Sequence, residues 1–147
     1  MGNTSNLSYF KGTDTPELIN ETIGQRLAKT VQAFPERDAL VVRHQGIRWT
    51  YAQYAAEIEK LATGLIALGI GKGDRVGIWA PNCYEWCLTQ FATARIGAIL
   101  VNVNPAYRVF ELEYALNKSG CSAIITAEAF KSSRYVEMLQ ELAPELA

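Results

Sequence analysis

The amino-acid sequence predicts an α/β fold: a three-layer, partly parallel sheet with helices on both faces. In the second half of the chain, short apolar, β-branched segments alternate with amphipathic helical segments, as in helix-covered parallel sheets. Residues 73–107 in particular predict strand, helix and strand, a βαβ unit that joins neighbouring parallel strands. Open parallel sheets bind ligands beyond the carboxyl ends of their strands, so the loops at that edge are the first candidates for function.

The N-terminal part predicts an unstructured arm followed by a helix. Residues 1–19 show no periodicity and are expected to form a loosely ordered arm, with the folded part over residues 20–147. Thr22 followed by Gln25 predicts a capping box at the start of the helix, and Phe34-Pro35 ends it. The apolar face of this helix is formed by Ile23, Leu27 and Val31.

A hairpin and a longer helix follow. Ala39–Arg43 and Ile47–Thr50 are strand-like, and Gln45-Gly46 between them predicts a turn. Thr50 and Gln53 predict a second capping box. The apolar stripe of the helix after it, at helical spacing, consists of Tyr51, Tyr54, Ile58, Leu61, Leu65 and Leu68.

The central βαβ unit begins with a strand at Arg75–Trp79, whose apolar run is typical of a strand covered on both faces. Asn82 with Glu85 three residues later predicts the start of the next helix. Gly97 ends that helix, and Ala98–Val103 predicts the second strand.

A third strand and two further helices complete the pattern. Val109–Lys118 predicts a helix that Gly120 terminates, and Cys121–Thr126 predicts a strand. A last amphipathic helix would bury Tyr135, Met138, Leu139 and Leu142. We expect Val76, Leu100 and Ile124 to lie on three adjacent strands that run in the same direction.

The overall composition argues against several classes of partner. The chain has 147 residues, with 14 basic and 15 acidic side chains scattered along it and a formal net charge of −1. Without a basic stripe, neither a nucleic-acid partner nor an electrostatic membrane contact is expected. No stretch approaches the roughly 18 apolar residues of a membrane span. The polar first twenty residues resemble no secretory or mitochondrial leader, so a cytoplasmic protein is expected.

The chain offers few groups for catalysis or metal binding. The odd count of three cysteines does not suggest a disulfide framework. Cys83 and Cys87 are one helical turn apart, yet the single histidine, His44, is distant in sequence, so buried thiols are favoured over a metal site. No nucleophile, base and orienting residue can be assembled, so no catalytic residue is assigned. Glu111 and Glu113 lie at a helix start, where acidic side chains complement the dipole.

Two other motifs have simple structural explanations. The run from Gly69 to Gly73 resembles a phosphate loop in composition, but it follows a helix and opens a strand, so a helix end and tight turn is favoured. The aromatic and sulfur side chains around the central helix suggest either an acyl pocket or plain core, and core is favoured. These side chains are Trp79, Cys83, Trp86, Cys87 and Phe91.

The loop Asn104–Arg108 is the strongest candidate for a contact site. It leaves the carboxyl end of a strand and brings Arg108 to the start of the next helix. Free helix amides, the dipole and a guanidinium together favour a phosphate or pyrophosphate group. A proline-stiffened crossover that binds nothing is the alternative, and spacing alone does not separate the two. The loop residues are Asn104, Pro105, Ala106, Tyr107 and Arg108.

Four segments resemble the AMP-forming acyl-CoA synthetases, the superfamily of acyl- and aryl-CoA ligases, peptide-synthetase adenylation domains and luciferases. They are WTYAQY (49–54), GDRVGIWAPNCYEW (73–86), ATARIGAILVNVNPAY (92–107) and ELEYALNKSG (111–120). The resemblance covers residues 9–147 and is closest to the medium-chain fatty-acyl-CoA synthetases. It implies that the chain is the first part of the large N-terminal domain of the adenylate-forming fold.

The resemblance implies a two-step reaction in the parent enzyme. A fatty carboxylate attacks the α-phosphate of ATP to give acyl-AMP and pyrophosphate, and the CoA thiol then displaces AMP, with Mg²⁺ neutralising the polyphosphate. In relatives, the loop that matches Asn104–Arg108 lies near the CoA channel. The family's phosphate loop, adenine- and ribose-binding segments and mobile C-terminal domain have no counterpart in these residues. We therefore expect this chain alone to be inactive and to bind ATP, CoA and Mg²⁺ weakly at most.

Two alternatives stay open. The second interpretation, after the ligase fragment, is a non-catalytic interaction or nucleotide-binding α/β module, in which exposed apolar edges would favour a homo-oligomer or a domain-swapped dimer. A dinucleotide-dependent oxidoreductase suits the βαβ pattern but lacks the glycine fingerprint after a strand.

Overall fold

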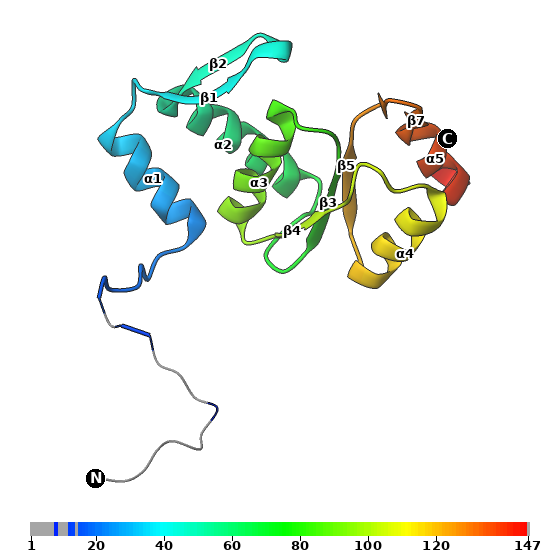
Figure 1. Ribbon diagram of the computed structural model, residues 1–147, viewed down its shortest axis with the longest axis horizontal. Coiled ribbons are helices and arrows are strands. Elements are labelled where there is room, and N and C mark those ends of the chain that lie inside the picture. The colour runs from blue at the N-terminus through cyan, green and yellow to red at the C-terminus, as the bar shows by residue number, and fades with distance from the viewer. Residues whose placement is uncertain (1–7, 9–11, 14, 147) are drawn as a thin grey trace.

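Three parallel strands form the central sheet of the computed structural model (Figure 1). The sheet consists of β3 (Arg75–Trp79), β4 (Ile99–Asn102) and β5 (Ala123–Thr126), in the spatial order β4-β3-β5. Val76 pairs with Leu100 on one side and with Ala123 on the other, and Ile124 pairs with Gly77. The prediction of three adjacent strands that run in the same direction is therefore confirmed.

The structure describes residues 8, 12–13 and 15–146. The arm predicted over residues 1–19 lies largely outside these described residues. The described part of it, residues 15–19, runs without helix or strand toward the first helix, α1 (Ile23–Ala33).

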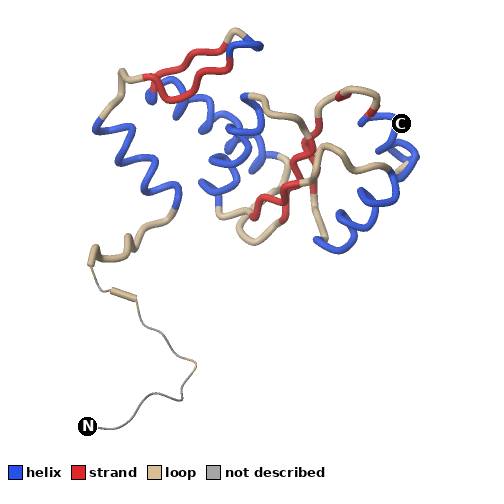
Figure 2. Tube along the Cα trace, in the orientation of Figure 1, coloured by secondary structure: helices blue, strands red, loops and turns tan. Residues whose placement is uncertain are grey.

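Helices cover both faces of the sheet, as the sequence predicts (Figure 2). On one face α2 (Tyr51–Ala67) and α3 (Tyr84–Ile96) pack against β3, and α1 packs on the outer side of α2 and α3. On the other face lie α4 (Val109–Ser119) and α5 (Tyr135–Leu142). Two separate apolar clusters result, one in each layer between helices and sheet.

The middle strand β3 contributes to both clusters. Val76 belongs to the cluster under α2 and α3, and Trp79 belongs to the cluster under α4 and α5. Both side chains are fully buried, because alternate side chains of a strand point to opposite faces. This explains why the sequence of β3 is continuously apolar rather than alternating.

The predicted hairpin is β1 (Asp38–Val42) paired antiparallel with β2 (Ile47–Thr50). A short 3-10 helix, Arg43–Gln45, and Gly46 in the left-handed region (φ 68°) join the two strands in place of a two-residue turn. The hairpin packs on α2. Backbone bonds from the Tyr51 amide to the Arg37 carbonyl (3.0 Å) and from the Ala52 amide to the Pro35 carbonyl (3.0 Å) tie the start of α2 to the segment that leads into β1.

The capping boxes at Thr22 and Thr50 are confirmed, but the predicted helix start at Asn82 is wrong. The Thr22 hydroxyl accepts from the Gln25 amide (3.2 Å), and the Thr50 hydroxyl accepts from the Gln53 amide (3.3 Å). Helix α3 instead begins at Tyr84 with Cys83 as N-cap and no side-chain cap from Cys83. The reason is tertiary, because the first helical amide, that of Tyr84, donates to the side chain of Gln45 (2.8 Å) on the hairpin.

Three further details differ from the sequence-based expectations. Leu68 is 81% exposed, because α2 ends at Ala67 and its buried stripe runs through Tyr54, Ile58, Ala62 and Leu65 only. Strand β4 is shorter than the predicted Ala98–Val103. The sequence also missed a small antiparallel pair, β6 (Ala129–Phe130) with β7 (Ser133–Arg134), and a terminal 3-10 helix, Pro144–Leu146.

The glycine-rich run between α2 and β3 forms a turn, as predicted. Gly69 (φ 85°) and Gly73 (φ 91°) both adopt left-handed backbone angles that glycine tolerates without strain. The Asp74 carboxylate accepts a hydrogen bond from the Gly71 amide (2.8 Å) and closes the turn. Lys72 is exposed there, as expected for a loop lysine.

Candidate functional site

The carboxyl edge of the sheet brings together three segments that are far apart in the sequence. The loop Ala80–Cys83 leaves β3, the loop Asn104–Arg108 leaves the β4 side, and the hairpin turn Arg43–Gln45 lies against the first of these loops. A cavity of about 280 Å³ opens between the hairpin turn and the ends of β3 and β5, and we call it the edge cavity. Its lining is His44, Gln45, Ile78, Ala80, Pro81, Asn82, Cys83, Glu85, Ile125, Thr126 and Ala127.

Gln45 is the polar link between the hairpin and the edge of the sheet. Its amide nitrogen donates to the Glu85 carboxylate (2.9 Å), and its carbonyl oxygen accepts from the Tyr84 backbone amide (2.8 Å). Both bonds span about forty residues of sequence. Sequence reasoning missed Gln45, because its only local signal is that it stands in a turn.

Cys83 and Glu85 of the edge cavity are not tuned for nucleophilic chemistry. Burial raises the pKa of the Cys83 thiol above its ordinary value, so the thiol stays protonated at neutral pH. Burial also acts to raise the pKa of Glu85, but hydrogen bonds, led by the one from Gln45, outweigh it and hold that pKa below its ordinary value. Glu85 is therefore a fixed negative charge that helps to position the start of α3.

A second cavity of about 410 Å³ adjoins the edge cavity and shares His44, Asn82 and Cys83 with it. Trp86 and Cys87 of α3 also line it, and burial raises the pKa of the Cys87 thiol. Across residues 8, 12–13 and 15–146, no three histidine, cysteine, aspartate or glutamate side chains gather closely enough to hold a metal ion. Of the aromatic side chains considered in the sequence, Trp79 lies in the core and Trp86 lines a cavity.

The loop Asn104–Arg108, predicted as the contact site, is anchored from below by two aromatic side chains. The Trp79 indole nitrogen donates to the Asn104 carbonyl (3.1 Å), and the Tyr135 hydroxyl donates to the Pro105 carbonyl (2.7 Å). The two rings stack with centroids 3.9 Å apart. Within the loop, the Asn104 side chain accepts from the Ala106 amide (2.9 Å), so the first three residues of the loop are held in place.

Arg108 lies at the start of α4, where its backbone amide donates to the Glu111 carboxylate (3.0 Å). Its guanidinium donates to the hydroxyl of Ser133 (2.9 Å), a buried residue of β7. The residue itself remains exposed, so the other guanidinium donors face solvent. The lining of the edge cavity includes none of the residues 104–108, so the loop and the cavity are separate features of the same edge.

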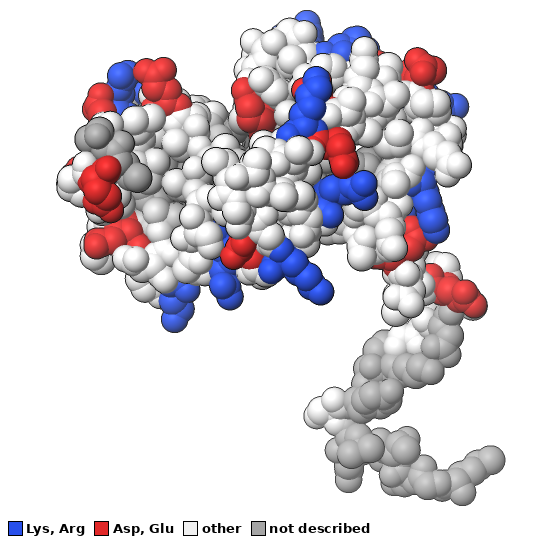
Figure 3. Space-filling model, turned by 180° about the vertical axis from the view of Figure 1, so that it is seen from behind, with Lys and Arg blue, Asp and Glu red and all other residues white. Residues whose placement is uncertain are grey.

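The exposed surface shows no single dominant charge on the side that Figure 3 presents. Basic and acidic side chains are interspersed there. Exposed ion pairs of the molecule include Arg95 with Glu59 (3.1 Å) and Arg134 with Glu137 (3.2 Å). Exposed pairs of this kind contribute little to stability. Among the helices that the structure describes, none has the length and apolarity needed to cross a bilayer.

Comparison with known proteins identifies the family to which this chain belongs. The family model described as AMP-binding enzyme matches residues 27–147. The chain is 49% identical over 140 residues to the medium-chain acyl-CoA ligase ACSF2, mitochondrial, of Mus musculus, and 47% identical over 130 residues to the putative acyl-CoA synthetase YngI of Bacillus subtilis. These matches cover 95% and 88% of this chain but only 23% and 24% of those relatives.

Solved structures support the same assignment. A putative long-chain-fatty-acid CoA ligase from Rhodopseudomonas palustris superimposes with a TM-score of 0.75 at 31% identity, over 86% of this chain and 30% of that one. The N-terminal domain of FACL13 from Mycobacterium tuberculosis gives a TM-score of 0.69 at 35% identity, over 71% and 26%. The chain spans about a quarter of the length of these ligases, and it belongs to the AMP-binding enzyme family, as a homologue of the AMP-forming acyl-CoA ligases.

Proposed function

We propose that this chain provides the first α/β portion of an AMP-forming fatty-acyl-CoA ligase. The parent reaction joins a carboxylate to CoA in two steps, through an acyl-adenylate, with release of pyrophosphate and then of AMP. The observation that supports this most is the family match across residues 27–147, together with 49% identity to a medium-chain acyl-CoA ligase. A medium-chain fatty acid, ATP and CoA are accordingly the proposed substrates of the whole enzyme.

The part that this chain plays is structural. In the edge cavity the Cys83 thiol is protonated and the Glu85 carboxylate is bonded to Gln45, so these two groups supply no activated nucleophile. Within the described part of the chain, no three histidine, cysteine, aspartate or glutamate side chains gather to form a metal site. We propose that the chain alone neither adenylates a carboxylate nor hydrolyses ATP.

A pyrophosphate-release assay tests this directly. The 147-residue chain is incubated with ATP, Mg²⁺ and octanoate, with and without CoA, beside an active acyl-CoA ligase as the positive control. We expect no octanoate-dependent release of pyrophosphate above the rate without protein. Octanoate-dependent turnover by the purified chain would overturn the proposal of an inactive scaffold.

We propose further that Asn104–Arg108 faces the path of CoA in the whole enzyme. The support is the exposed guanidinium of Arg108 at the start of α4, on a loop held by Trp79 and Tyr135. The carboxylate of Glu111 opposes an anion there, so binding to the chain alone is expected to be weak. Titration with millimolar CoA, followed by amide chemical shifts, should move the signals of Asn104 and of residues 106–108 in the native chain and not in Arg108→Gln.

We also propose the cytoplasm as the compartment. The name of the ACSF2 relatives places those proteins in mitochondria, so the mitochondrion is the alternative compartment. Fractionation of cells that express the chain with a C-terminal tag distinguishes the two.

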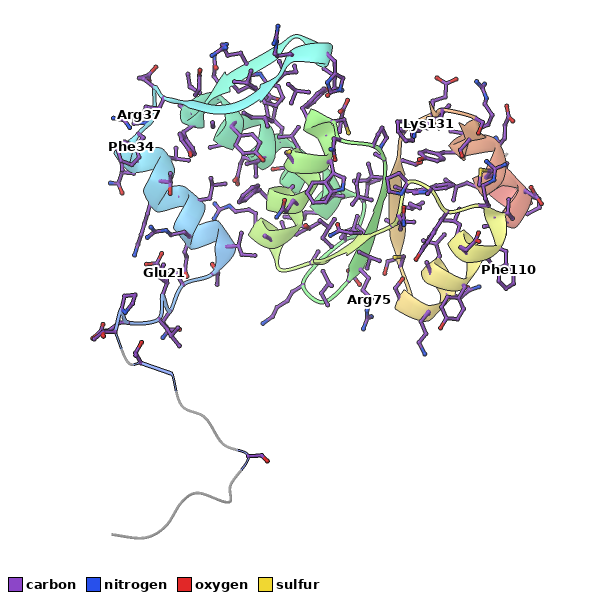
Figure 4. The ribbon with its side chains drawn as sticks, in the orientation of Figure 1. Glu21, Phe34, Arg37, Arg75, Phe110 and Lys131 are labelled. Atoms are coloured by element: carbon purple, nitrogen blue, oxygen red, sulfur yellow. The ribbon has the colours of Figure 1, made fainter. Side chains whose placement is uncertain are left out.

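The exposed apolar side chains of α4 favour a second candidate function, a non-catalytic interaction module. Phe110 is 78% exposed and Tyr114 is 65% exposed, one helical turn apart on the outer side of α4, and Figure 4 shows Phe110 pointing away from the body. Such a pair would support a homo-oligomer or a domain-swapped dimer. Light scattering that gives a monomer mass for the chain across its soluble range would argue against this function.

A further inference from the structure

A groove on the side of the molecule away from the loop Asn104–Arg108 has the properties of a ligand site. It has a volume of about 590 Å³ and lies where α1 meets β1, the start of α2 and the outer side of α3. None of its lining residues comes from β3, β4, β5 or the loops that follow them. Its size falls in the range of roughly 300–1,000 Å³ that is usual for small-molecule pockets.

The wall of this groove, which we call the α1 groove, is mainly apolar. Leu27 of α1, Leu40 of β1 and Phe91 of α3 form it together with Ile23, which is 58% exposed in the absence of any cover. The Tyr54 hydroxyl at the wall is already used, because it donates to the Cys87 carbonyl (2.8 Å). An occupant therefore needs an apolar body, since only apolar contact is available along most of the wall.

One polar atom of the groove lacks the partner that its burial demands. Glu21, at the start of α1 (Figure 4), lines the groove, and its Oε2 atom is buried without a hydrogen-bond partner. The other carboxylate oxygen, Oε1, accepts from the Lys29 ammonium at 2.7 Å. The Glu21 side chain is 21% exposed, and buried polar atoms are almost always hydrogen-bonded, so a donor that enters the groove would satisfy Oε2.

The charges around Glu21 determine what kind of donor fits. Lys29 already balances the carboxylate, and the guanidinium-bearing Arg26 lines the same groove. A cationic head group would therefore add a third positive charge, and a carboxylate head group would place two acceptors against each other at Oε2. A neutral head group that donates a hydrogen bond satisfies Oε2 with neither penalty.

We propose that the α1 groove binds a small neutral amphiphile, with an apolar chain along Leu27, Leu40 and Phe91 and a hydrogen-bond-donating head group on the Glu21 Oε2 atom. A primary amide of medium chain length has this chemistry. The site does not depend on the ligase function proposed above, because it uses no residue of the carboxyl-edge loops.

The test compares four eight-carbon probes on the full 147-residue chain by calorimetry and amide chemical shifts. Octanamide is neutral and donates, methyl octanoate only accepts, octanoate is an anion and octylamine is a cation. We expect octanamide to bind at least about tenfold more tightly than each of the other three, with shifts at Leu27, Leu40 and Phe91. Equal or tighter binding of octanoate, octylamine or methyl octanoate, or no binding of octanamide, would overturn the proposal.

A matched pair of variants separates the head-group contact from a general loss of charge. Glu21→Met removes the acceptor at similar side-chain length, and Glu17→Met removes an exposed carboxylate that does not line the groove. We expect Glu21→Met to weaken the binding of octanamide about tenfold and to leave the affinity for methyl octanoate unchanged. Glu17→Met should change neither affinity. Far-UV circular dichroism verifies that both variants fold, and octanamide affinity unaffected by Glu21→Met contradicts the assignment.

Discussion

Individual side chains hold the candidate edge of the sheet mainly by bonding to backbone groups of distant segments. Gln45 caps the start of α3 from the hairpin, and Tyr135 holds the loop Asn104–Arg108 from α5. Each bond is worth about 0.5–1.5 kcal/mol, and removal of one partner leaves a polar group unsatisfied. These residues are therefore the places where single substitutions test the structure of the site.

The first residue-scale prediction concerns Tyr135. Burial raises the pKa of its hydroxyl, which stays a donor to the Pro105 carbonyl at any neutral pH. Tyr135→Phe leaves that carbonyl without the donor, and we expect a loss of about 1 kcal/mol in the free energy of unfolding, measured with urea. The control is Tyr114→Phe, whose hydroxyl is on an exposed side chain, and it should change stability by less than about 0.5 kcal/mol. Equal effects of both substitutions would contradict the anchoring role.

The second prediction concerns Gln45 and pH. Because the pKa of folded Glu85 lies below its ordinary value, ionised Glu85 stabilises the fold above its unfolded pKa of about 4.3, and this contribution is lost as the pH falls through the folded pKa. Gln45→Ala should cost about 1–2 kcal/mol at pH 7 and less in acid, where protonated Glu85 is a weaker acceptor.

Urea unfolding at pH 7 and at pH 3.5 measures both differences for Gln45. Gln140→Ala on the exposed side of α5 serves as the control and should be near neutral at both pH values. A cost for Gln45→Ala that does not decrease in acid would mean that its bond to Glu85 contributes little.

At the scale of elements, helix ends decide where the strands and loops lie. Thr22 and Thr50 start α1 and α2 through capping boxes, and glycines with left-handed backbone angles end α3 and α4. At the end of α3, Gly97 must also approach the side chain of Lys72, whose Cγ would lie 3.2 Å from a Cβ at that position. The turn into β4 therefore depends on glycine for both conformation and space.

The element-scale prediction compares two glycines. Gly97→Ala should destabilise the protein by about 1–2 kcal/mol, because it forces a left-handed angle (φ 76°) on a residue with a Cβ. Gly64→Ala, in the middle of α2 with nothing within 4 Å of the new Cβ, should stabilise it by about 0.5–1 kcal/mol. Thermal and urea unfolding of the two variants show whether each substitution raises or lowers the free energy of unfolding. The same sign for both would refute the assigned end of α3.

At the scale of the whole molecule, two apolar clusters share one strand. The cluster with Ile58 and Val76 and the cluster with Trp79 and Leu112 lie on opposite faces of the sheet, and β3 supplies residues to both. Among the residues that the structure describes, none belongs to both clusters, yet loss of β3 would disrupt both. The chain should therefore unfold in one cooperative transition, while small changes in the two clusters act independently.

Conservative substitutions in the two clusters test this arrangement. Ile58→Val, on the buried face of α2, and Ile124→Val, packed against the other cluster, should each cost about 0.5–1.5 kcal/mol. The double variant should show the sum to within about 0.5 kcal/mol in urea unfolding, with a single transition. A second transition, or a large departure from the sum, would show that the clusters unfold separately or are coupled.

Much of the fold follows from local patterns, and the candidate site follows only in part. The apolar run of β3, the capping boxes and Gly97 predict their elements correctly, because each depends on contacts within a few residues. The predicted start of α3 at Asn82 was wrong, because Gln45, about forty residues away, satisfies the first amide of the helix. The loop Asn104–Arg108 lies at the edge where strand order predicts it, but its anchors Trp79 and Tyr135 could not be read from the sequence.

The sequence by itself determined the order of helices and strands, the parallel direction of β3, β4 and β5, and the resemblance to acyl-CoA synthetases. Those properties rest on periodicity and on short motifs, which are encoded locally. Only the tertiary structure decided that the hairpin closes the edge cavity, and that Glu21 leaves one oxygen buried in the α1 groove. Cavities and unpaired atoms are made by side chains that meet across long stretches of chain, so no local pattern records them.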